Sequence, residues 1–416
     1  MNVTQISSSD VIGGRFNGYG IRHLLANEGI VSTHLVWNKL GKDGSSSHFF
    51  PIPGSRHATS ALIRIEDMLS IHGRTALQSF TLPLHRQFQT ADLIHYHIIH
   101  DGYFSLDALP WLSRRKPTIW TVHDPWIFTG HCIYPVGCER WQIGCGQCPR
   151  LDLPFAMRRD RTEQDFAWKR NILLKSDLEI VVASESMRRM AAASPIARGK
   201  RLHVIPFGID LQKFAPGDAA AARARLGILP GRIAIGVRAF PLSPYKGFEF
   251  FVEALRRLEG LDTPLAIVTT NTKGQLNEFI GKHQIIDLGW VNDESLILDS
   301  YQALDMFVMP SIAEAFGMMA IEAMACGKPV IVFDGTSLPD IVRAPEVGVA
   351  VARGDTEALA DAIKSLVENK DQRERRGLAG RALSEELYDD RLFAKRLADL
   401  YRSVAARRTG PADGTP

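Results

Sequence analysis

The chain has 416 residues, of which 45% are hydrophobic and 23% charged, and its 49 basic and 46 acidic residues give a formal net charge of +3. This composition is typical of soluble globular proteins, and it argues against wholesale disorder and against a surface that coats nucleic acid. No apolar run approaches the roughly 18 to 20 residues of a membrane-spanning helix, and the N-terminal residues lack the basic and apolar regions of a secretory signal. We therefore expect two or three domains of about 150 residues each and a cytoplasmic location.

Short β-branched runs alternate with segments of helical periodicity along the chain, which is typical of parallel sheets covered by helices on both faces. In the first half, strands are predicted at residues 2–6, 33–37, 93–97, 118–122, 179–183 and 202–205. In the second half, strands are predicted at residues 233–237, 265–269, 285–288, 306–309, 330–333 and 347–351. The pattern predicts an α/β protein with two Rossmann-like, doubly wound domains.

Turn-forming residues concentrate between the two halves. Pro206 and Gly208 are followed by Pro216-Gly217, a short alanine-rich helix and Pro230-Gly231, which indicates a hinge near Pro206. Sheets of this kind bind ligands beyond the carboxyl ends of their strands. We therefore expect the two domains to face each other across a cleft that holds the site.

The segment 310–329 reads P-S-I-A-E-A-F-G-M-M-A-I-E-A-M-A-C-G-K-P, with a helix predicted from about Phe316 to Gly327. Glu314 and Glu322 bracket the start of this helix, whose N-terminus suits a phosphate group. At a rise of 1.5 Å per residue, Glu322 lies roughly 8 to 10 Å along the axis, near the span of a diphosphate with a sugar at each end. The alternative is a solvent-facing Glu314 and an ordinary salt bridge at Glu322.

This segment resembles the signature of retaining family 4 glycosyltransferases of the GT-B fold. Four other segments also match the family: residues 13–14, 121–124, 204–210 and 288–291. The resemblance implies an acceptor-binding domain at residues 1–205 and a nucleotide-sugar-binding domain at 206–388. It also implies a final helix at 389–408 that crosses back to the first domain; the tail at 409–416 is expected to be frayed.

The resemblance also assigns roles to individual residues. Those expected to take part in catalysis are His123, Arg238, Lys246 and Glu314. Those expected to bind substrate are Gly13, Gly14, Asp124, Trp290, Phe316, Gly317, Met318 and Glu322. From position alone, Arg238 and Lys246 would more often be surface residues, and His123 has even odds of a structural role. We expect the adjacent Asp124 to orient His123. Two cations and a helix N-terminus suit a leaving diphosphate, so we expect catalysis without a metal cofactor. No carboxylate lies in a recognisable nucleophile motif, and the resemblance implies a front-face mechanism.

Four of the five cysteines lie within an excursion at residues 131–149, in a C-x5-C-x6-C-x2-C pattern. Cys132, Cys138, Cys145 and Cys148 are therefore candidate ligands of a structural zinc ion. Free thiols and a labile disulfide are the alternatives. Similar cysteine runs after T-x-H-D-x-W-x-F-T-G occur in a subgroup of the resembled family active in bacterial surface-polysaccharide synthesis, and we expect the excursion to shape the acceptor side of the cleft.

The expected function is retaining transfer of a hexosyl group from a nucleotide-diphosphate sugar to a hydroxyl of a lipid-linked saccharide, in exopolysaccharide, capsule or O-antigen lipopolysaccharide synthesis. Basic residues at 114–116, 158–159, 161 and 169–170 favour contact with the inner face of the plasma membrane, although a solvated helix face is the default interpretation. No nucleic-acid partner is expected. The rival hypotheses are a non-catalytic nucleotide-sugar-binding assembly subunit and a sugar-nucleotide epimerase on the same fold.

Overall fold

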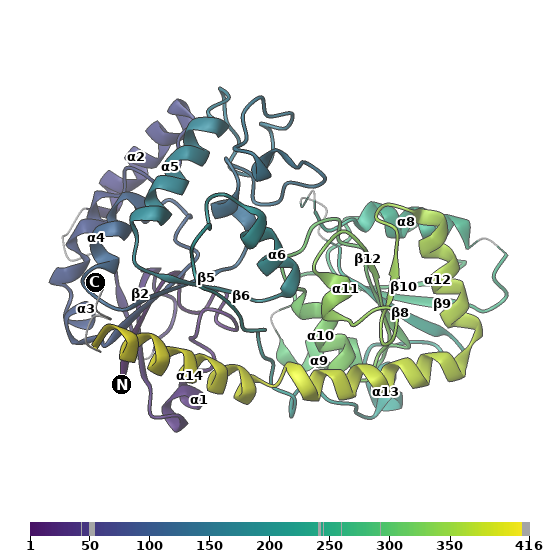
Figure 1. Ribbon diagram of the computed structural model, residues 1–416. Helices are drawn as coiled ribbons and strands as arrows, with labels where there is room; N and C mark the ends of the chain where they lie inside the picture. The colour runs from purple at the N-terminus through teal and green to yellow at the C-terminus, as the bar shows by residue number, and fades with distance from the viewer. Residues whose placement is uncertain are drawn as a thin grey trace. The chain divides into compact units, whose positions relative to one another are not determined.

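The computed structural model describes residues 1–409 apart from positions 43, 50–54, 240–242, 244, 259 and 292 (Figure 1). The chain forms two compact units. Unit 1 comprises residues 1–208 together with the last helix, α14 (Asp390–Thr409), and unit 2 comprises residues 209–389. The expected division placed these boundaries after residues 205 and 388. Most of the tail expected to be frayed, residues 410–416, lies outside the described residues.

Unit 1 is built on a seven-stranded parallel sheet with the order β3-β2-β1-β4-β5-β6-β7. Its strands are β1 (Asn2–Ser9), β2 (Val31–Asn38), β3 (Ser46–His48), β4 (Leu93–His97), β5 (Thr118–Val122), β6 (Glu179–Val182) and β7 (Leu202–Val204). Each strand predicted for this half is present. Strand β3 was not predicted, because its sequence, Ser-Ser-His, has neither β-branched nor apolar residues.

Helices cover the sheet of unit 1. They are α1 (Arg22–Asn27), α2 (Ser55–Leu69), α3 (Arg86–Thr90), α4 (Leu109–Ser113), α5 (Thr162–Lys175), α6 (Glu185–Ala193) and α14, with 3₁₀ turns η1 (Leu77–Leu84), η2 (Leu106–Ala108), η3 (Pro125–Phe128) and η4 (Arg140–Gln142). Helices α1 and α14 pack together, as do α4 and α5 (Figure 1). Trp120 and Trp126 are among the largest fully buried side chains, and they anchor the core at the carboxyl end of β5.

Unit 2 is built on a six-stranded parallel sheet with the order β10-β9-β8-β11-β12-β13. Its strands are β8 (Ile233–Val237), β9 (Leu265–Thr269), β10 (Gln284–Asp287), β11 (Met306–Met309), β12 (Val330–Phe333) and β13 (Val349–Val351). Its helices are α7 (Ala219–Arg225), α8 (Phe248–Arg257), α9 (Glu294–Gln302), α10 (Met318–Ala325), α11 (Leu338–Ile341), α12 (Thr356–Glu368) and α13 (Lys370–Leu387), with the 3₁₀ turn η5 (Asn277–Phe279). Apolar side chains of α8 and α12 form a core against this sheet.

Both sheets have a point at which the strand order reverses. In unit 1 it lies between β1 and β4, and in unit 2 it lies between β8 and β11. Loops leave in opposite directions on the two sides of such a point, which opens a crevice at the carboxyl ends of the strands. No helix of the described residues is long and apolar enough to span a bilayer.

Candidate active site

At the switch point of unit 2, the loop after β8 and the loop after β11 are joined by backbone contacts. The N–H of Ile312 donates to the carbonyl oxygen of Tyr245 at 2.9 Å. Gly247 has φ +63°, and a Cβ added there would lie 2.0 Å from the carbonyl oxygen of Pro310. Only glycine permits this approach. The loops therefore hold Lys246 close to the segment that carries Glu314.

Lys246 and Glu314 form an ion pair at the mouth of this crevice. The Nζ of Lys246 lies 2.6 Å from Oε2 of Glu314, and the two side chains are 26% and 12% exposed. The hydroxyl of Ser337 donates to the carbonyl oxygen of Glu314 at 2.9 Å, which fixes the backbone of the acidic residue. Two residues predicted to act in catalysis, 68 positions apart in the chain, are thus in direct contact.

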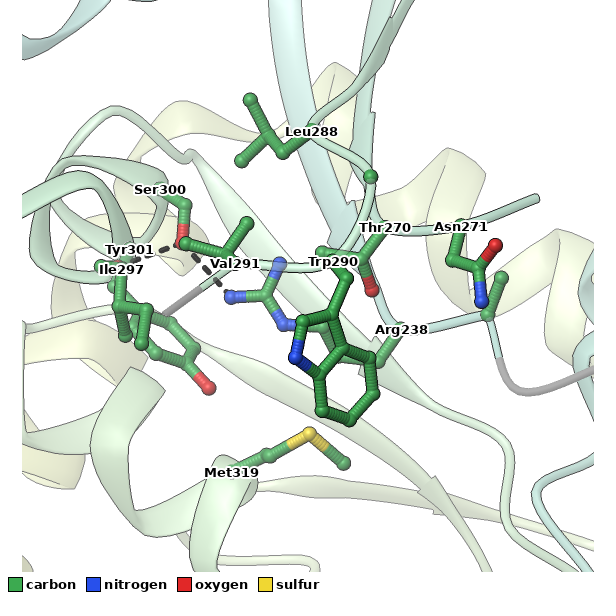
Figure 2. Close-up of a pocket in the computed structure, with 12 residues that line it drawn as sticks. Arg238, Thr270, Asn271, Leu288, Trp290, Val291, Ile297, Ser300, Tyr301 and Met319 are labelled. Carbon is green, nitrogen blue, oxygen red and sulfur yellow. Dashed lines mark hydrogen bonds between the residues drawn. The ribbon is translucent and has the colours of Figure 1, made fainter. Parts of the chain in front are cut away.

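A cavity of about 170 Å³ lies at the carboxyl ends of β8, β9 and β10, and Figure 2 shows Arg238 at its centre. The guanidinium donates to the hydroxyl of Ser300 at 2.8 Å and lies 5.0 Å from the ring centroid of Tyr301. Trp290, which is 75% exposed, and Met319 form an apolar wall beside the cation (Figure 2). A flat ring beside a positive charge suits a nucleotide base and its phosphates.

Glu322 lies behind this cavity. It is 2% exposed, and its Oε2 accepts a hydrogen bond from the hydroxyl of Tyr301 at 2.7 Å. Tyr301 lines the cavity, whereas Glu322 is absent from the described residues that line it. The predicted contact of Glu322 with substrate therefore stays a prediction, and the structure connects this carboxylate to the cavity through Tyr301.

Three other predicted binding residues lie at the start of α10. The ring of Phe316 is 4% exposed and packs edge-on against Tyr388, at 5.9 Å between ring centroids, so this side chain belongs to the core. Gly317 has φ +107°, and an added Cβ would lie 2.4 Å from Leu338. Met318 is the first residue of the helix and is half-buried. A ligand could therefore contact Phe316 and Gly317 only through their backbone atoms.

His123 follows β5 in unit 1 and lies among aromatic rings. Its Nε2 is 3.1 Å from Nδ1 of His97. The ring stacks on Phe207, at 5.4 Å and 16°, and contacts Phe16 at 5.0 Å. The Gly13-Gly14 turn carries Phe16 to this position, and Gly13 has φ +75°. Burial lowers the pKa of His123 to about 3, so the imidazole is neutral at physiological pH.

Asp124 does not hydrogen-bond His123, contrary to the expectation that it orients this histidine. Its carboxylate pairs with Nε2 of His100 at 3.1 Å and accepts the N–H of Trp126 at 3.0 Å. Burial raises the pKa of Asp124, but the charge and hydrogen bond of His100 bring it below its ordinary value. The expectation is wrong because neighbouring side chains in extended backbone point to opposite faces.

The four clustered cysteines are half-buried free thiols. The Sγ of Cys145 accepts the N–H of Gly130 at 3.2 Å, and the Sγ of Cys148 lies 3.4 Å from Nε2 of His131. Burial raises the pKa of Cys132 to about 11 and that of Cys145 to about 12. Within the described part of the chain, no three His, Cys, Asp or Glu side chains are placed to hold a metal ion. The zinc site therefore stays a prediction.

Lys169 was counted from the sequence among basic surface residues, and the structure corrects this. It is 1% exposed, and its Nζ donates to the carbonyl oxygens of Trp126 at 2.7 Å and Thr129 at 3.1 Å. Burial lowers its pKa to about 7. Lys169 is a structural anchor between α5 and the start of the cysteine-containing excursion, so it cannot contribute to a surface patch.

A second cavity, of about 850 Å³, lies within unit 1 beside its switch point. Residues at the carboxyl ends of β1, β2 and β4 line one side, and residues 155–158 line another. Trp37 and Phe155 contribute aromatic rings, and Asp67 and Asp101 contribute exposed carboxylates. These residues could not be identified from the sequence, because nothing in their spacing shows that they converge.

Two family models match the chain. Residues 52–213 match the model described as Glycosyltransferase Family 4, and residues 239–383 match the model described as Glycosyl transferases group 1.

Among curated relatives, the D-inositol 3-phosphate glycosyltransferase of Nocardia farcinica is 27% identical over 73% of this chain, and the match covers 66% of that protein. The enzyme of the same name from Rhodococcus erythropolis is 28% identical over 88% of this chain and 81% of its own length. The chain thus spans slightly less than two thirds of the first of these relatives.

Solved structures resemble the whole chain. Sucrose-phosphate synthase from Thermosynechococcus elongatus superposes with a TM-score of 0.69 and 20% identity, covering 98% of this chain and all of that one. Anabaena Alr3699/HepE in complex with UDP-glucose gives a TM-score of 0.63 and 16% identity, covering 97% and 100%. With its two parallel-sheet units, the chain therefore has the GT-B fold, with residues 52–213 similar to the Glycosyltransferase Family 4 model and residues 239–383 similar to the Glycosyl transferases group 1 model.

Proposed function

We propose that this protein is a glycosyltransferase that moves a sugar from a nucleotide-diphosphate sugar to a hydroxyl group of an acceptor. The observation that carries the proposal is the switch point of unit 2, where the Arg238 cavity and the Lys246–Glu314 pair both lie at the carboxyl ends of the strands. The similarity to a protein solved with UDP-glucose supports a donor of this class.

The chemistry follows from where charge develops. As the glycosidic bond to the diphosphate breaks, negative charge grows on the leaving oxygen, and positioned cations stabilise it more than they stabilise the bound donor. Arg238 and Lys246 provide these cations, and the N-terminus of α10 adds the partial positive charge of a helix end. A bound diphosphate would compete with Glu314 for Lys246. Loss of this ion pair would leave the Glu314 carboxylate available to accept hydrogen bonds from the hydroxyls of the donor sugar.

Retention of configuration and independence from metal ions are part of the proposal. They rest on the resemblance of residues 310–329 to retaining enzymes and on the presence of Arg238 and Lys246 in the site. In the front-face route, the leaving phosphate accepts the proton of the acceptor hydroxyl as that oxygen bonds to the anomeric carbon. No side chain of the protein then needs to act as a nucleophile.

For the acceptor, we propose the saccharide part of a lipid-linked molecule. The cavity of unit 1 presents Trp37 and Phe155, whose rings can stack on the apolar face of a sugar, and the carboxylates of Asp67 and Asp101, which accept hydrogen bonds from hydroxyls. Arg158 is the one lysine or arginine among the described residues that line it. The relatives are named for D-inositol 3-phosphate, and a phosphate would favour a more cationic cavity.

Contact with the cytoplasmic face of the plasma membrane is the further element of the proposal. On η1, the side chains of Leu77, Phe80 and Leu84 are 65%, 41% and 70% exposed. Phe80 packs against Trp111, and the guanidinium of Arg115 lies 3.8 Å above the ring of Trp111. Exposed apolar side chains beside basic ones suit an anionic bilayer. A role in exopolysaccharide, capsule or O-antigen synthesis rests on the resemblance of the T-x-H-D-x-W-x-F-T-G segment.

A binding experiment tests the donor site. We expect one member of a panel of UDP-, GDP-, ADP-, dTDP- and CDP-sugars to raise the melting temperature. Arg238→Ala should remove this stabilisation, whereas Arg232→Ala, on the amino side of β8, should preserve it. A panel without any stabilising sugar nucleotide would refute the proposal. A binding-only subunit would show the shift without turnover, and an epimerase would convert the donor without an acceptor.

A further inference from the structure

The C-terminal helix places a tyrosine against the sheet of unit 1. Tyr401, on α14, is fully buried, and its hydroxyl lies 2.8 Å from Nδ1 of His95. The side-chain amide of Gln5, on β1, donates to the same hydroxyl at 3.2 Å. The hydroxyl of Tyr401 therefore makes hydrogen bonds with residues of two strands, β4 and β1.

The network continues from Gln5 to His123. The Oε1 of Gln5 lies 2.8 Å from Nε2 of His97, and Nδ1 of His97 lies 3.1 Å from Nε2 of His123. Gln5 and His97 are buried, at 0% and 1% exposure. A continuous chain of hydrogen bonds therefore connects α14, β1, β4 and the end of β5, and each of its members belongs to unit 1.

The proton positions can be assigned one residue at a time along these hydrogen bonds. An amide oxygen only accepts, so the proton of His97 lies on Nε2 and is donated to Gln5. Burial lowers the pKa of His97 well below its ordinary value, so the ring is neutral and its Nδ1 is an acceptor. His123 must then donate from Nε2. Because His123 is also neutral, its Nδ1 carries a lone pair and no proton.

The Nδ1 of His123 is the last atom of this chain of hydrogen bonds. It is shielded from solvent and has no hydrogen-bond partner among the described residues. A buried acceptor without a partner is uncommon in native structures and is often completed by a ligand. A bare imidazole nitrogen complements a hydroxyl group, whereas it repels a phosphate or carbonyl oxygen. Phe16 also packs against the ring of His123, at 5.0 Å between ring centroids.

We propose that Gln5 and Tyr401 are positioning residues that hold His123 in its Nε2–H tautomer, so that Nδ1 accepts a hydrogen bond from a sugar hydroxyl. The identity of the ligand as a sugar rests on the proposed function, whereas the tautomer does not. Helix α14 thereby influences a residue at the carboxyl edge of the sheet, even though Tyr401 and His123 are not in direct contact.

Nitrogen-15 spectroscopy of the histidine side chains tests the tautomer in the ligand-free protein. The signals of His123 are assigned by their loss in His123→Gln. Between pH 5.5 and 8 we expect His123 to have an unprotonated Nδ1 and a protonated Nε2 and not to titrate. The titratable groups around the ring are His97, His100 and Asp124. A protonated Nδ1, or an imidazolium in this range, would overturn the proposal.

Variants test the positioning role. Gln5→Met keeps the length of the side chain and removes the acceptor of His97, so we expect the Nδ1–H tautomer of His123 to become populated. Ser32→Ala is the matched control, because it removes another contact of Gln5 at 3.3 Å and leaves the chain to His123 intact. If Gln5→Met does not fold, Tyr401→Phe replaces it and should shift the same signals by less. A variant spectrum identical to that of the wild type would refute the role of that residue.

The hydroxyl contact has its own readout. Saturation with the sugar nucleotide that stabilises the protein most should move the Nδ1 signal of His123 toward the value of a hydrogen-bonded acceptor. An Nδ1 signal that does not move with any member of the panel would refute this contact while leaving the tautomer standing. Failure of sugar-nucleotide binding altogether would refute the proposed function instead.

Discussion

Replacement of Lys246 by alanine removes one partner of the ion pair at the switch point of unit 2. Lys246 is 2.6 Å from Glu314, whose side chain is only 12% exposed, so the variant leaves a poorly solvated carboxylate without its cation. Because the lysine is itself 26% exposed, solvent screening reduces the effect, and we expect a loss of about 1 to 2 kcal/mol in the free energy of unfolding. The fold should persist, since unit 2 keeps its core.

The effect of the same substitution on activity should be larger. Loss of one preorganised group that stabilises developing charge typically costs about 2.7 to 4 kcal/mol in the transition state, so kcat should fall by roughly a hundredfold to a thousandfold. Urea unfolding measures the first effect, and release of nucleoside diphosphate in the presence of an acceptor measures the second. Lys282→Ala, at an exposed lysine of the same unit, is the control. Activity of Lys246→Ala within a few-fold of the wild type would refute this reasoning.

Three further outcomes are expected. Glu322→Ala should weaken nucleotide binding more than it lowers kcat, because the carboxylate holds the hydroxyl of Tyr301 at the cavity wall; an unchanged donor affinity with a large fall in kcat would contradict this. If zinc binds, elemental analysis of protein purified without added metal should find close to one zinc per chain, and Cys145→Ser should impair acceptor use more than nucleotide binding; a metal-free and fully active protein would exclude the site. Burial raises the pKa of Glu179, but its hydrogen bonds with His203 and Arg407 lower it to about 2. The contribution of this carboxylate to stability should therefore be present above about pH 4.5 and be lost toward pH 2. Acid unfolding curves should show this loss, and Glu179→Gln should reduce the dependence of stability on pH.

The strands were predictable because most of them are buried in parallel sheets and consist of short β-branched runs. Strands β5 and β12, T-I-W-T-V and V-I-V-F, are buried along their whole length, and their bounds agree with those predicted. Strand β3 has no such signal, since it forms only through pairing with β2. The end of α10 was also predictable, because Gly327 follows its C-cap residue, Cys326, whereas its first residue is Met318 and not the predicted Phe316.

The contacts within the site were less predictable. Tyr245 and Ile312 join two loops through a backbone hydrogen bond, and tertiary contacts of this kind bring Lys246 to Glu314. The sequence suggested Asp124 as the partner of His123, whereas the structure gives that place to His97 on a neighbouring strand. Tyr401 lies 306 positions from His95, and no local pattern indicates that they meet.

The most direct test of the central claim is acceptor-dependent turnover. The purified protein is incubated with the stabilising sugar nucleotide and with synthetic polyprenyl-diphosphate saccharides or D-inositol 3-phosphate, and mass spectrometry follows both substrates. The account predicts that nucleoside diphosphate and an acceptor heavier by one sugar form together and that neither forms without acceptor. Lys246→Ala should slow the formation of both by roughly a hundredfold or more. Conversion of the donor without an acceptor, or binding of the donor with no glycosylated product from any acceptor, would contradict it.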